Sequence, residues 1–195
     1  MTEDTNLPNW FANDGQKNFE EILLPLFKGR DARYLQIGAY TGDASIWLYD
    51  NLLKNSDSVL VDVDTWEGSD EIAHHEMNWD TVENVYDTKI VHARNERKII
   101  KVKLTSDYFF KNNQDKFDFV YVDGDHTAYG VIKDAVNAFE ALKPGGIIAF
   151  DDYQWIGAHA PADRPQMAID AFLAIYRKHI TVLHKQYQCW VQKNV

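Results

Sequence analysis

Residues 117–130 read FDFVYVDGDHTAYG, and this stretch decides the fold. The apolar run from Phe119 to Val122 is typical of a strand buried on both faces. The run leads directly into a group of side chains that can carry charge: Asp123, Asp125 and His126. A strand that ends in this way is expected to carry its polar residues to a functional site.

Strands and helices alternate on both sides of this stretch. The expected strands are 34–37, 58–64, 98–104, 117–123 and 147–150, and the expected helices are 17–28, 43–53, 131–142 and 163–178. The tail ITVLHKQYQCWVQKN reads as two strands joined near Lys185 and Gln186. The pattern predicts a Rossmann-like α/β fold, with a mostly parallel sheet flanked by helices and a C-terminal antiparallel hairpin.

Composition and length are those of one globular domain, so residues 1–195 are expected to form a single domain. A net charge of -10 argues against a nucleic-acid-binding surface, which requires a basic footprint. The N-terminus lacks signal-peptide character, and no stretch approaches the length of a membrane span. Cys189 is the one cysteine, which excludes an intrachain disulfide. We therefore expect a cytoplasmic protein.

The carboxyl ends of the five expected parallel strands all carry polar or glycine residues. Ligands of open parallel sheets bind at this edge, because the strand ends and their loops meet there. The sequence thus predicts one site built from these residues: Gly38 to Gly42, Asp64, Ser106, Asp107, Asp123, Asp125, His126, Asp151 and Asp152.

The turn between Gly38 and Gly42 follows the first strand and precedes a helix. Its glycines either shape a turn or let backbone approach a ligand, and the sequence leaves both open. The dinucleotide fingerprint G-x-G-x-x-G is absent because Tyr40 stands at its second glycine, which disfavours an NAD-dependent enzyme. Asp64 suits the hydroxyl pair of a ribose.

Asp123, Asp151 and Asp152 form the sharper cluster. Neighbouring carboxylates repel unless a cation compensates, and oxygen ligands suit Mg²⁺. The alternative is that they are separate acids that cap helices or face water. Asp125 and His126 are equal candidates for a general base beside this cluster.

With these motifs in place, the sequence resembles the class I S-adenosylmethionine-dependent methyltransferases. It is most similar to the small metal-dependent O-methyltransferases that include macrocin and related antibiotic-sugar enzymes. The stretches that carry the resemblance are YLQIGAYTGDASIWL, VLVDVDTWEGSD, FDFVYVDGDHTAYGVIKDAVNAFEALKPGGIIAFDDY and AIDAFLAIYRKHITVLHKQYQCWVQK.

The resemblance implies a seven-stranded sheet and assigns roles by position. S-adenosylmethionine would be bound by residues on the turn and the neighbouring strand ends: Gln36, Gly38, Ala39, Tyr40, Gly42, Ser45, Asp64, Trp66, Ser106 and Asp123. Trp66 and Ser106 would lie near the adenine. Mg²⁺ would be held by Asp123, Asp151 and Asp152, and Asp125 or His126 would act as base.

Two features depart from the family pattern. Gln36 stands where the family usually has an acid, so a hydrogen-bonding side chain replaces a charge. The polar segment 67–97, which contains His74 and His75, has no confident counterpart and is expected to form part of a substrate lid.

The leading hypothesis is Mg²⁺-assisted O-methylation of a sugar or another small molecule that carries neighbouring hydroxyls. One alternative is a metal-independent methyltransferase whose acids orient a substrate amine, and another is a catalytically silent domain that binds the cofactor. The expected partner is a small-molecule substrate, with neither nucleic acid nor membrane involved, and a homo-oligomer is possible.

Overall fold

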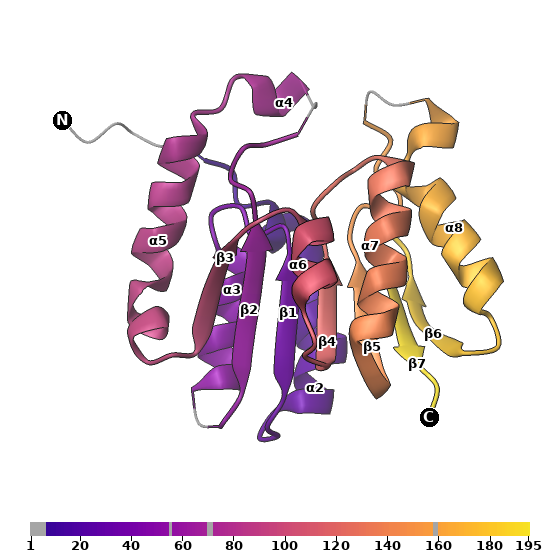
Figure 1. Cartoon of the computed structure of the whole chain (residues 1–195), viewed down its shortest axis with the longest axis horizontal. Helices are drawn as coiled ribbons and strands as arrows, with labels where there is room; N and C mark the ends of the chain where they lie inside the picture. Colours follow the sequence, from indigo (N-terminus) through magenta and orange to yellow (C-terminus); the bar gives the residue numbers. More distant parts are fainter. Residues whose placement is uncertain (1–6, 55, 70–71, 158–159) are drawn as a thin grey trace.

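The computed structural model describes residues 7–54, 56–69, 72–157 and 160–195 (Figure 1). Seven strands are formed: β1 (Arg33–Ile37), β2 (Val59–Asp64), β3 (Ile99–Lys103), β4 (Phe117–Val122), β5 (Leu142–Phe150), β6 (Ile180–Lys185) and β7 (Cys189–Lys193). The α-helices are α1 (Gln16–Asn18), α2 (Leu24–Phe27), α3 (Asp43–Leu48), α4 (Ile72–His75), α5 (Trp79–Asn95), α6 (Ser106–Asn112), α7 (Ala128–Ala141) and α8 (Pro165–Tyr176). Wider helical turns at Phe11–Gly15, Phe19–Leu23 and Tyr49–Leu53 extend α1, α2 and α3.

The strands form one sheet in the order β3-β2-β1-β4-β5-β7-β6. The pairs β1–β2, β2–β3, β1–β4 and β4–β5 are parallel. β7 is antiparallel to both β5 and β6, so it is the reversed strand of the C-terminal hairpin. The predicted fold class, a mostly parallel sheet closed by an antiparallel hairpin, is confirmed.

Helices cover both faces of the sheet, and each face has its own apolar core. One core joins Phe19, Leu48 and Ile90 to the side chains of the sheet that face them, so the N-terminal helices, α3 and α5 lie on this face. The other core joins Val131 and Phe172 to the opposite side chains of the sheet, which places α7 and α8 there. Alternate residues of the strands point to opposite faces, and this is why the central stretches Phe119–Val122 and Ile147–Phe150 are apolar throughout.

Helix α7 begins at Ala128, earlier than the expected start at 131. The side chain of Thr127 accepts a hydrogen bond from the backbone N–H of Gly130 at 3.0 Å and caps the helix. The helix ends at Ala141, and β5 begins with Leu142, so KPGG forms the first part of the strand.

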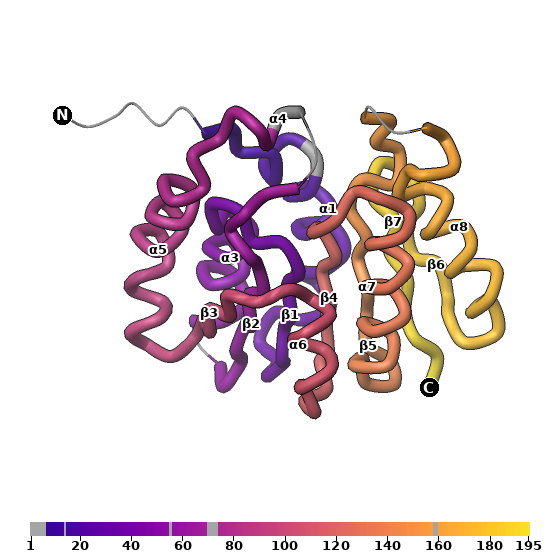
Figure 2. The backbone as a smooth tube through the Cα atoms, turned by 45° about the horizontal axis from the view of Figure 1, so that its top comes forward, coloured from indigo at the N-terminus to yellow at the C-terminus, as the bar shows by residue number. Residues whose placement is uncertain are grey.

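Most of the segment 67–97 is a packed helix, which differs from the expectation of a lid. α5 buries Val82, Tyr86 and Ile90 completely, because its apolar stripe faces the sheet beside β3. The part that precedes α5 passes over the carboxyl edge of the sheet. Figure 2 shows the N-terminal segment beside α4 at this edge, and the rings of Trp10 and His74 lie 6.0 Å apart.

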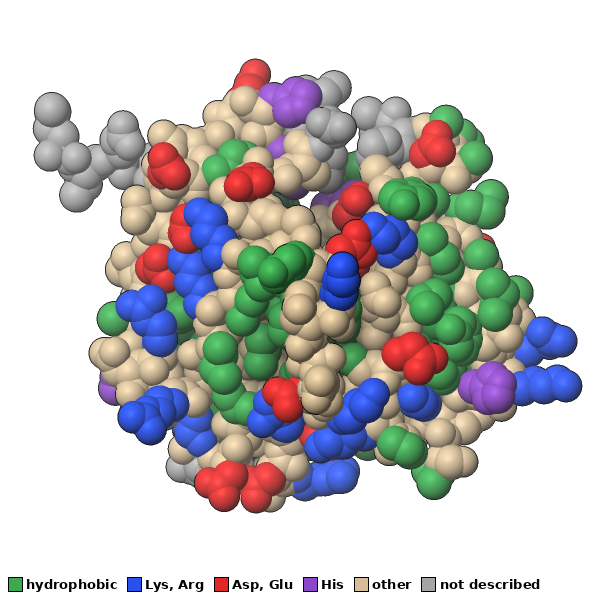
Figure 3. Space-filling model, viewed as in Figure 1, with side chains coloured by type: hydrophobic (Ala, Val, Ile, Leu, Met, Phe, Trp, Pro, Cys, Tyr) green, Lys and Arg blue, Asp and Glu red, His purple; other side chains and the backbone are tan. Residues whose placement is uncertain are grey.

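In the described part of the chain, no helix combines the length and apolar character needed to cross a membrane. On the face shown in Figure 3, Lys and Arg side chains lie among Asp and Glu side chains. Several of these are paired; for example, Lys101 contacts Glu83 at 2.6 Å and Asp87 at 2.8 Å.

Candidate active site

The glycine turn after β1 lies against the end of β4. Gly38 has a φ of 84°, and a Cβ atom added to it would stand 1.8 Å from the carbonyl oxygen of Asp123. Backbone hydrogen bonds of 2.9 Å run from Gly38 N to Val63 O and from Asp123 N to Ile37 O. Only glycine fits this position, since both the backbone angle and the missing side chain are required.

Asp64, at the end of β2, fixes the same turn. One of its carboxylate oxygens accepts the backbone N–H groups of Ala39 at 2.7 Å and Tyr40 at 2.9 Å. The other accepts the N–H of Trp66 at 2.8 Å. A carboxylate offers about four acceptor positions. Asp64 therefore orders the turn and retains acceptor capacity for a hydroxyl group.

A cavity of about 710 Å³ opens at the carboxyl edge of the sheet. It joins the glycine turn to the ends of β2, β3 and β4. The predicted site residues that line it are Gln36, Gly38, Ala39, Tyr40, Asp64, Ser106, Asp107, Asp123, Asp125 and His126. This size falls within the range of small-molecule and cofactor sites.

Buried polar side chains lie beneath the cavity. Ser45 is fully buried and lies 3.4 Å from Gln36 Oε1, while Gln36 Nε2 donates to Gly38 O at 2.8 Å. Asp62 is also fully buried and accepts a hydrogen bond from Tyr86 at 2.8 Å. Burial raises the pKa of Asp62 to about 7, although the Ser45 and Tyr86 hydroxyls lower it.

Trp66 and Gly42 also lie beneath the cavity lining. Trp66 is buried, its indole N–H donates to Tyr40 O at 2.9 Å, and its ring packs on Tyr86 at 4.7 Å. A Cβ atom on Gly42 would meet Tyr86 at 2.9 Å. Trp66 thus packs beneath the cavity, and its position near an adenine stays a prediction, while Ser106 lines the cavity.

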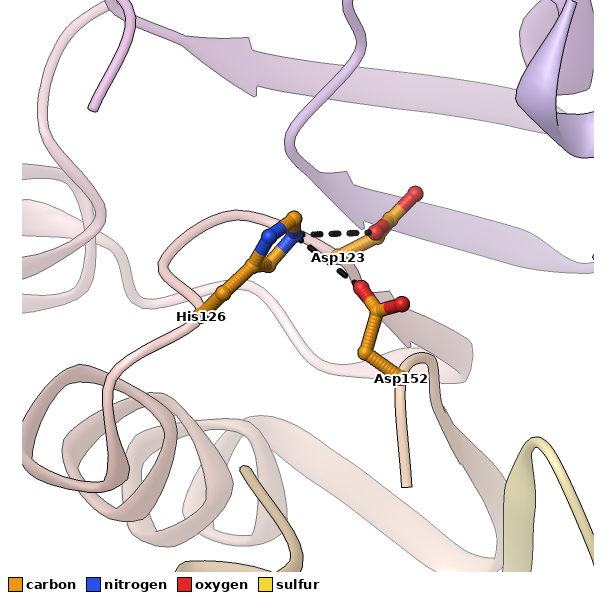
Figure 4. A group of neighbouring side chains, drawn as sticks. All are labelled: Asp123, His126 and Asp152. Atoms are coloured by element: carbon orange, nitrogen blue, oxygen red, sulfur yellow. Dashed lines mark ion pairs between the residues drawn. The ribbon is translucent and has the colours of Figure 1, made fainter. Parts of the chain in front are cut away.

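At the edge of the cavity, Asp123 and Asp152 approach His126. His126 Nε2 lies 3.0 Å from Asp152 Oδ2 and 3.8 Å from Asp123 Oδ1, as the dashed lines in Figure 4 show. Burial raises the pKa of Asp123 to about 6, and the nearby Asp152 charge adds to this effect, whereas His126 opposes it.

Asp151 is turned away from this group. One of its oxygens contacts the Tyr121 hydroxyl and the other accepts the backbone N–H of Asp152 at 2.9 Å. Burial and the charges of Asp123 and Asp152 raise its pKa well above the usual value. The three acids predicted to share a metal are adjacent, but a different trio, Asp123, His126 and Asp152, brings its ligand atoms within 4.8 Å of one another.

The two candidate bases differ in their surroundings. Asp125 is exposed and accepts the N–H of Thr127 at 2.7 Å, with its carboxylate over Gly130, where an added Cβ would be 2.1 Å from it. His126 is directed toward the two carboxylates. Asp125 thus faces solvent at the cavity, and His126 faces the acids.

An aromatic group lies on the cavity wall, and Tyr40 is the one member of it that was among the predicted site residues. The rings of Trp10 and Tyr40 stack at 4.6 Å, and the ring of Trp79 lies 5.1 Å from that of His74. All four residues line the cavity. No strand-end pattern marks Trp10 or Trp79, because each stands at the start of a helical segment and not at the end of a strand. The six tryptophans of the sequence were the one signal.

The chain is similar to known methyltransferases. A family model described as "Methyltransferase domain" matches residues 35–153. A curated relative, "Probable caffeoyl-CoA O-methyltransferase 3" of Dictyostelium discoideum, is 25% identical over 152 residues, which are 77% of this chain and 55% of the relative. The chain thus spans about half the length of that protein.

Two solved structures have the same fold. A putative rRNA methylase from Clostridium thermocellum is 14% identical with a TM-score of 0.68, over 92% of this chain and 97% of that one. The O-methyltransferase TomG of Streptomyces achromogenes, solved in complex with SAM, is 17% identical with a TM-score of 0.65, over 90% and 79%. The strand order, the glycine turn and the matching family model agree, and the chain belongs to the methyltransferase domain family with the class I S-adenosylmethionine-dependent fold.

Proposed function

We propose that the chain transfers the methyl group of S-adenosylmethionine to a hydroxyl oxygen of a small molecule, with the help of a divalent cation. The observation that carries this proposal is the single cavity that joins the glycine turn at Gly38 to Asp123, Asp125 and His126. A cofactor and an acceptor bound in one cavity can be held in attack geometry, which supplies much of the rate of a group transfer.

The cofactor half of the cavity is formed by the turn and two strand ends. Gly38 leaves backbone exposed at the turn, Asp64 offers a carboxylate suited to ribose hydroxyls, and Ser106 lies at the end of β3. Gln36 is neutral and donates to Gly38 O, so it holds the turn instead of supplying charge. S-adenosylmethionine supplies a methyl group on a positively charged sulfur.

The acceptor half is bounded by aromatic rings and by the acids. Trp10, Tyr40 and Trp79 offer flat apolar faces, which suit the C–H face of a sugar ring or the ring of a catechol-like molecule. Asp123, His126 and Asp152 lie beyond them at the cavity edge. This arrangement supports an acceptor that carries hydroxyl groups on a ring.

The acids and the imidazole fit a divalent cation. The resemblance assigns Mg²⁺ to Asp123, Asp151 and Asp152, and the two of these that converge are Asp123 and Asp152. When bound, a divalent cation lowers the pKa of a coordinated hydroxyl group and fixes its position. Asp125 or His126 would accept the proton that the hydroxyl releases, since both line the cavity.

Comparison with known proteins supports methyl transfer to oxygen. The Dictyostelium relative and TomG are both named as O-methyltransferases. Both are distant in sequence, so the acceptor of this chain is inferred from the cavity alone.

The first test is calorimetric titration with S-adenosylmethionine and, in parallel, with NAD. We expect the first to bind and NAD to give no heat. Asp64→Asn should weaken binding by at least about tenfold, because two or more hydrogen bonds to a charged group are lost. Asp115→Asn is the matched control, since Asp115 is exposed and pairs with Arg33 at the opposite end of β1.

The same titrations separate the alternatives. Binding of NAD and not of S-adenosylmethionine would overturn the proposal. If the cofactor binds, transfer of labelled methyl to a panel of sugars and catechols follows, with and without EDTA. Transfer that is unaffected by EDTA would favour a metal-independent enzyme, and no transfer to any acceptor would favour a silent cofactor-binding domain.

A further inference from the structure

Three side chains from two loops present ligand atoms to one point at the cavity edge. Asp123 follows β4, His126 lies in the loop before α7, and Asp152 follows β5. One oxygen or nitrogen atom of each lies within 4.8 Å of the others. In Figure 4 the imidazole points toward both carboxylates. Asp123 and His126 are three residues apart in the loop between β4 and α7, and Asp152 joins them from the loop after β5.

A cation bound at this point would stabilise the carboxylates around it. Asp123 and Asp152 bring carboxylate oxygens to within 4.8 Å of each other, and Asp151 directly precedes Asp152 in the chain, so three carboxylates lie close together. Among the ion pairs of the described residues, His126 is the one basic side chain within 4.0 Å of any of the three. In the part of the chain that the structure describes, no ion pair joins a lysine or an arginine to these carboxylates. A bound cation would therefore relieve the repulsion between them.

The donor set determines which cation fits. Mg²⁺ prefers oxygen ligands, whereas imidazole nitrogen suits zinc, iron, nickel and copper ions. The third carboxylate, Asp151, would complete an all-oxygen set, but it is directed at the Tyr121 hydroxyl and the Asp152 N–H. The Nε2 atom of His126 takes its place beside Asp123 and Asp152.

We propose that Asp123, His126 and Asp152 form a binding site for a divalent first-row transition metal, with His126 Nε2 as a ligand, and that this site binds such an ion in preference to Mg²⁺. The role of the ion in methyl transfer rests on the proposed function, whereas its binding does not. A ligating His126 has no free Nε2 lone pair, so the general base of the reaction is then Asp125.

The test is calorimetric titration of the chelator-treated full chain with CoCl₂, ZnCl₂ and MgCl₂, without cofactor or acceptor. We expect Co²⁺ and Zn²⁺ to bind with one site per chain and at least about tenfold more tightly than Mg²⁺. His126→Asn should weaken Co²⁺ binding by at least about tenfold. It should therefore reduce the difference between the affinities for Co²⁺ and Mg²⁺.

Two variants serve as controls. Asp151→Asn keeps the shape of the side chain and should leave Co²⁺ affinity within about threefold of wild type, because Asp151 is directed elsewhere. His92→Asn removes an exposed imidazole on α5 that pairs with Glu96, and it should leave the Co²⁺ affinity unchanged. Circular dichroism melting checks that each variant is folded.

Three results would overturn the assignment: tighter binding of Mg²⁺ than of Co²⁺, unchanged Co²⁺ affinity in folded His126→Asn, or a loss in Asp151→Asn that exceeds the loss in His126→Asn. A separate titration with S-adenosylmethionine keeps the two proposals apart. Failure of the wild-type chain to bind the cofactor would refute the proposed function and leave the metal result standing.

Discussion

Gly38→Ala tests whether the glycine turn and the end of β4 depend on each other. The residue has a φ of 84°, and the new methyl group would lie 1.8 Å from the carbonyl oxygen of Asp123 and 2.9 Å from the Cα of Gly124. These are backbone atoms, so no side chain can rotate away. Either the turn must leave β4 or the loop that carries Asp123 must move.

Gly29→Ala is the matched control. Gly29 has a similar φ of 77°, but a Cβ atom there would have no heavy atom within 4 Å. Both variants incur the cost of a left-handed alanine, about 1–2 kcal/mol. Gly38→Ala also overpacks the turn, which adds about 1–3 kcal/mol. The expected destabilisation is therefore about 2–5 kcal/mol for Gly38→Ala and about 1–2 kcal/mol for Gly29→Ala.

Thermal melting followed by circular dichroism measures this difference. For a chain of this length 1 kcal/mol lowers the Tm by about 2–4 °C. Gly38→Ala should also bind S-adenosylmethionine more weakly than Gly29→Ala, because the displaced turn lines the cavity. If Gly38→Ala melts no lower than Gly29→Ala and binds the cofactor as the wild type does, the close approach of turn and strand does not matter, and the reasoning fails.

Two further predictions concern stability. The pKa of Asp62 is raised to about 7, so between about pH 4 and 7 the folded chain holds a proton that the unfolded chain has released, and stability falls as the pH rises. Urea unfolding should show that wild type loses about 3 kcal/mol more than Asp62→Asn between pH 5 and 8; equal pH slopes would show that Asp62 is not titrating in this range. Thr127→Ala removes the cap of α7 and should cost about 1 kcal/mol, measured as a Tm lower by about 2–4 °C, whereas Thr127→Ser should retain most of the stability. An unchanged Tm in Thr127→Ala would mean that the cap is replaced by water.

The sequence determined the fold and the edge of the sheet that carries the site. Alternating strand and helix patterns, the KPGG stretch after the helix expected over 131–142 and the two terminal strands were sufficient, because each is a local property of side-chain size and polarity. The stretch from Phe119 to Val122 is apolar enough to be buried on both faces, which indicated its place inside the sheet. Ligands bind at the carboxyl ends of parallel strands, and this rule predicted that Gly38, Asp64 and Asp123 share one site. All three line the same cavity.

Only the tertiary structure decided which of these groups face one another. Asp151 and Asp152 are neighbours in sequence, yet successive residues at the end of a strand point to opposite sides, and Asp152 has a φ of 57° that turns the chain. Asp151 therefore faces Tyr121 and Asp152 faces His126. The sequence listed these side chains along the chain but carried no information on their directions.

The same reason applies to the aromatic residues of the site. Trp66 lies near a strand end, and only the structure shows that its ring packs on Tyr86 and donates a hydrogen bond to the backbone of the glycine turn. Trp10 and Trp79 are distant in sequence, and both reach the cavity because the N-terminal helical segment and α5 pack on the same face of the sheet. Residue type and spacing determined where chemistry could occur, and the packing of segments far apart in the chain determined which side chains perform it.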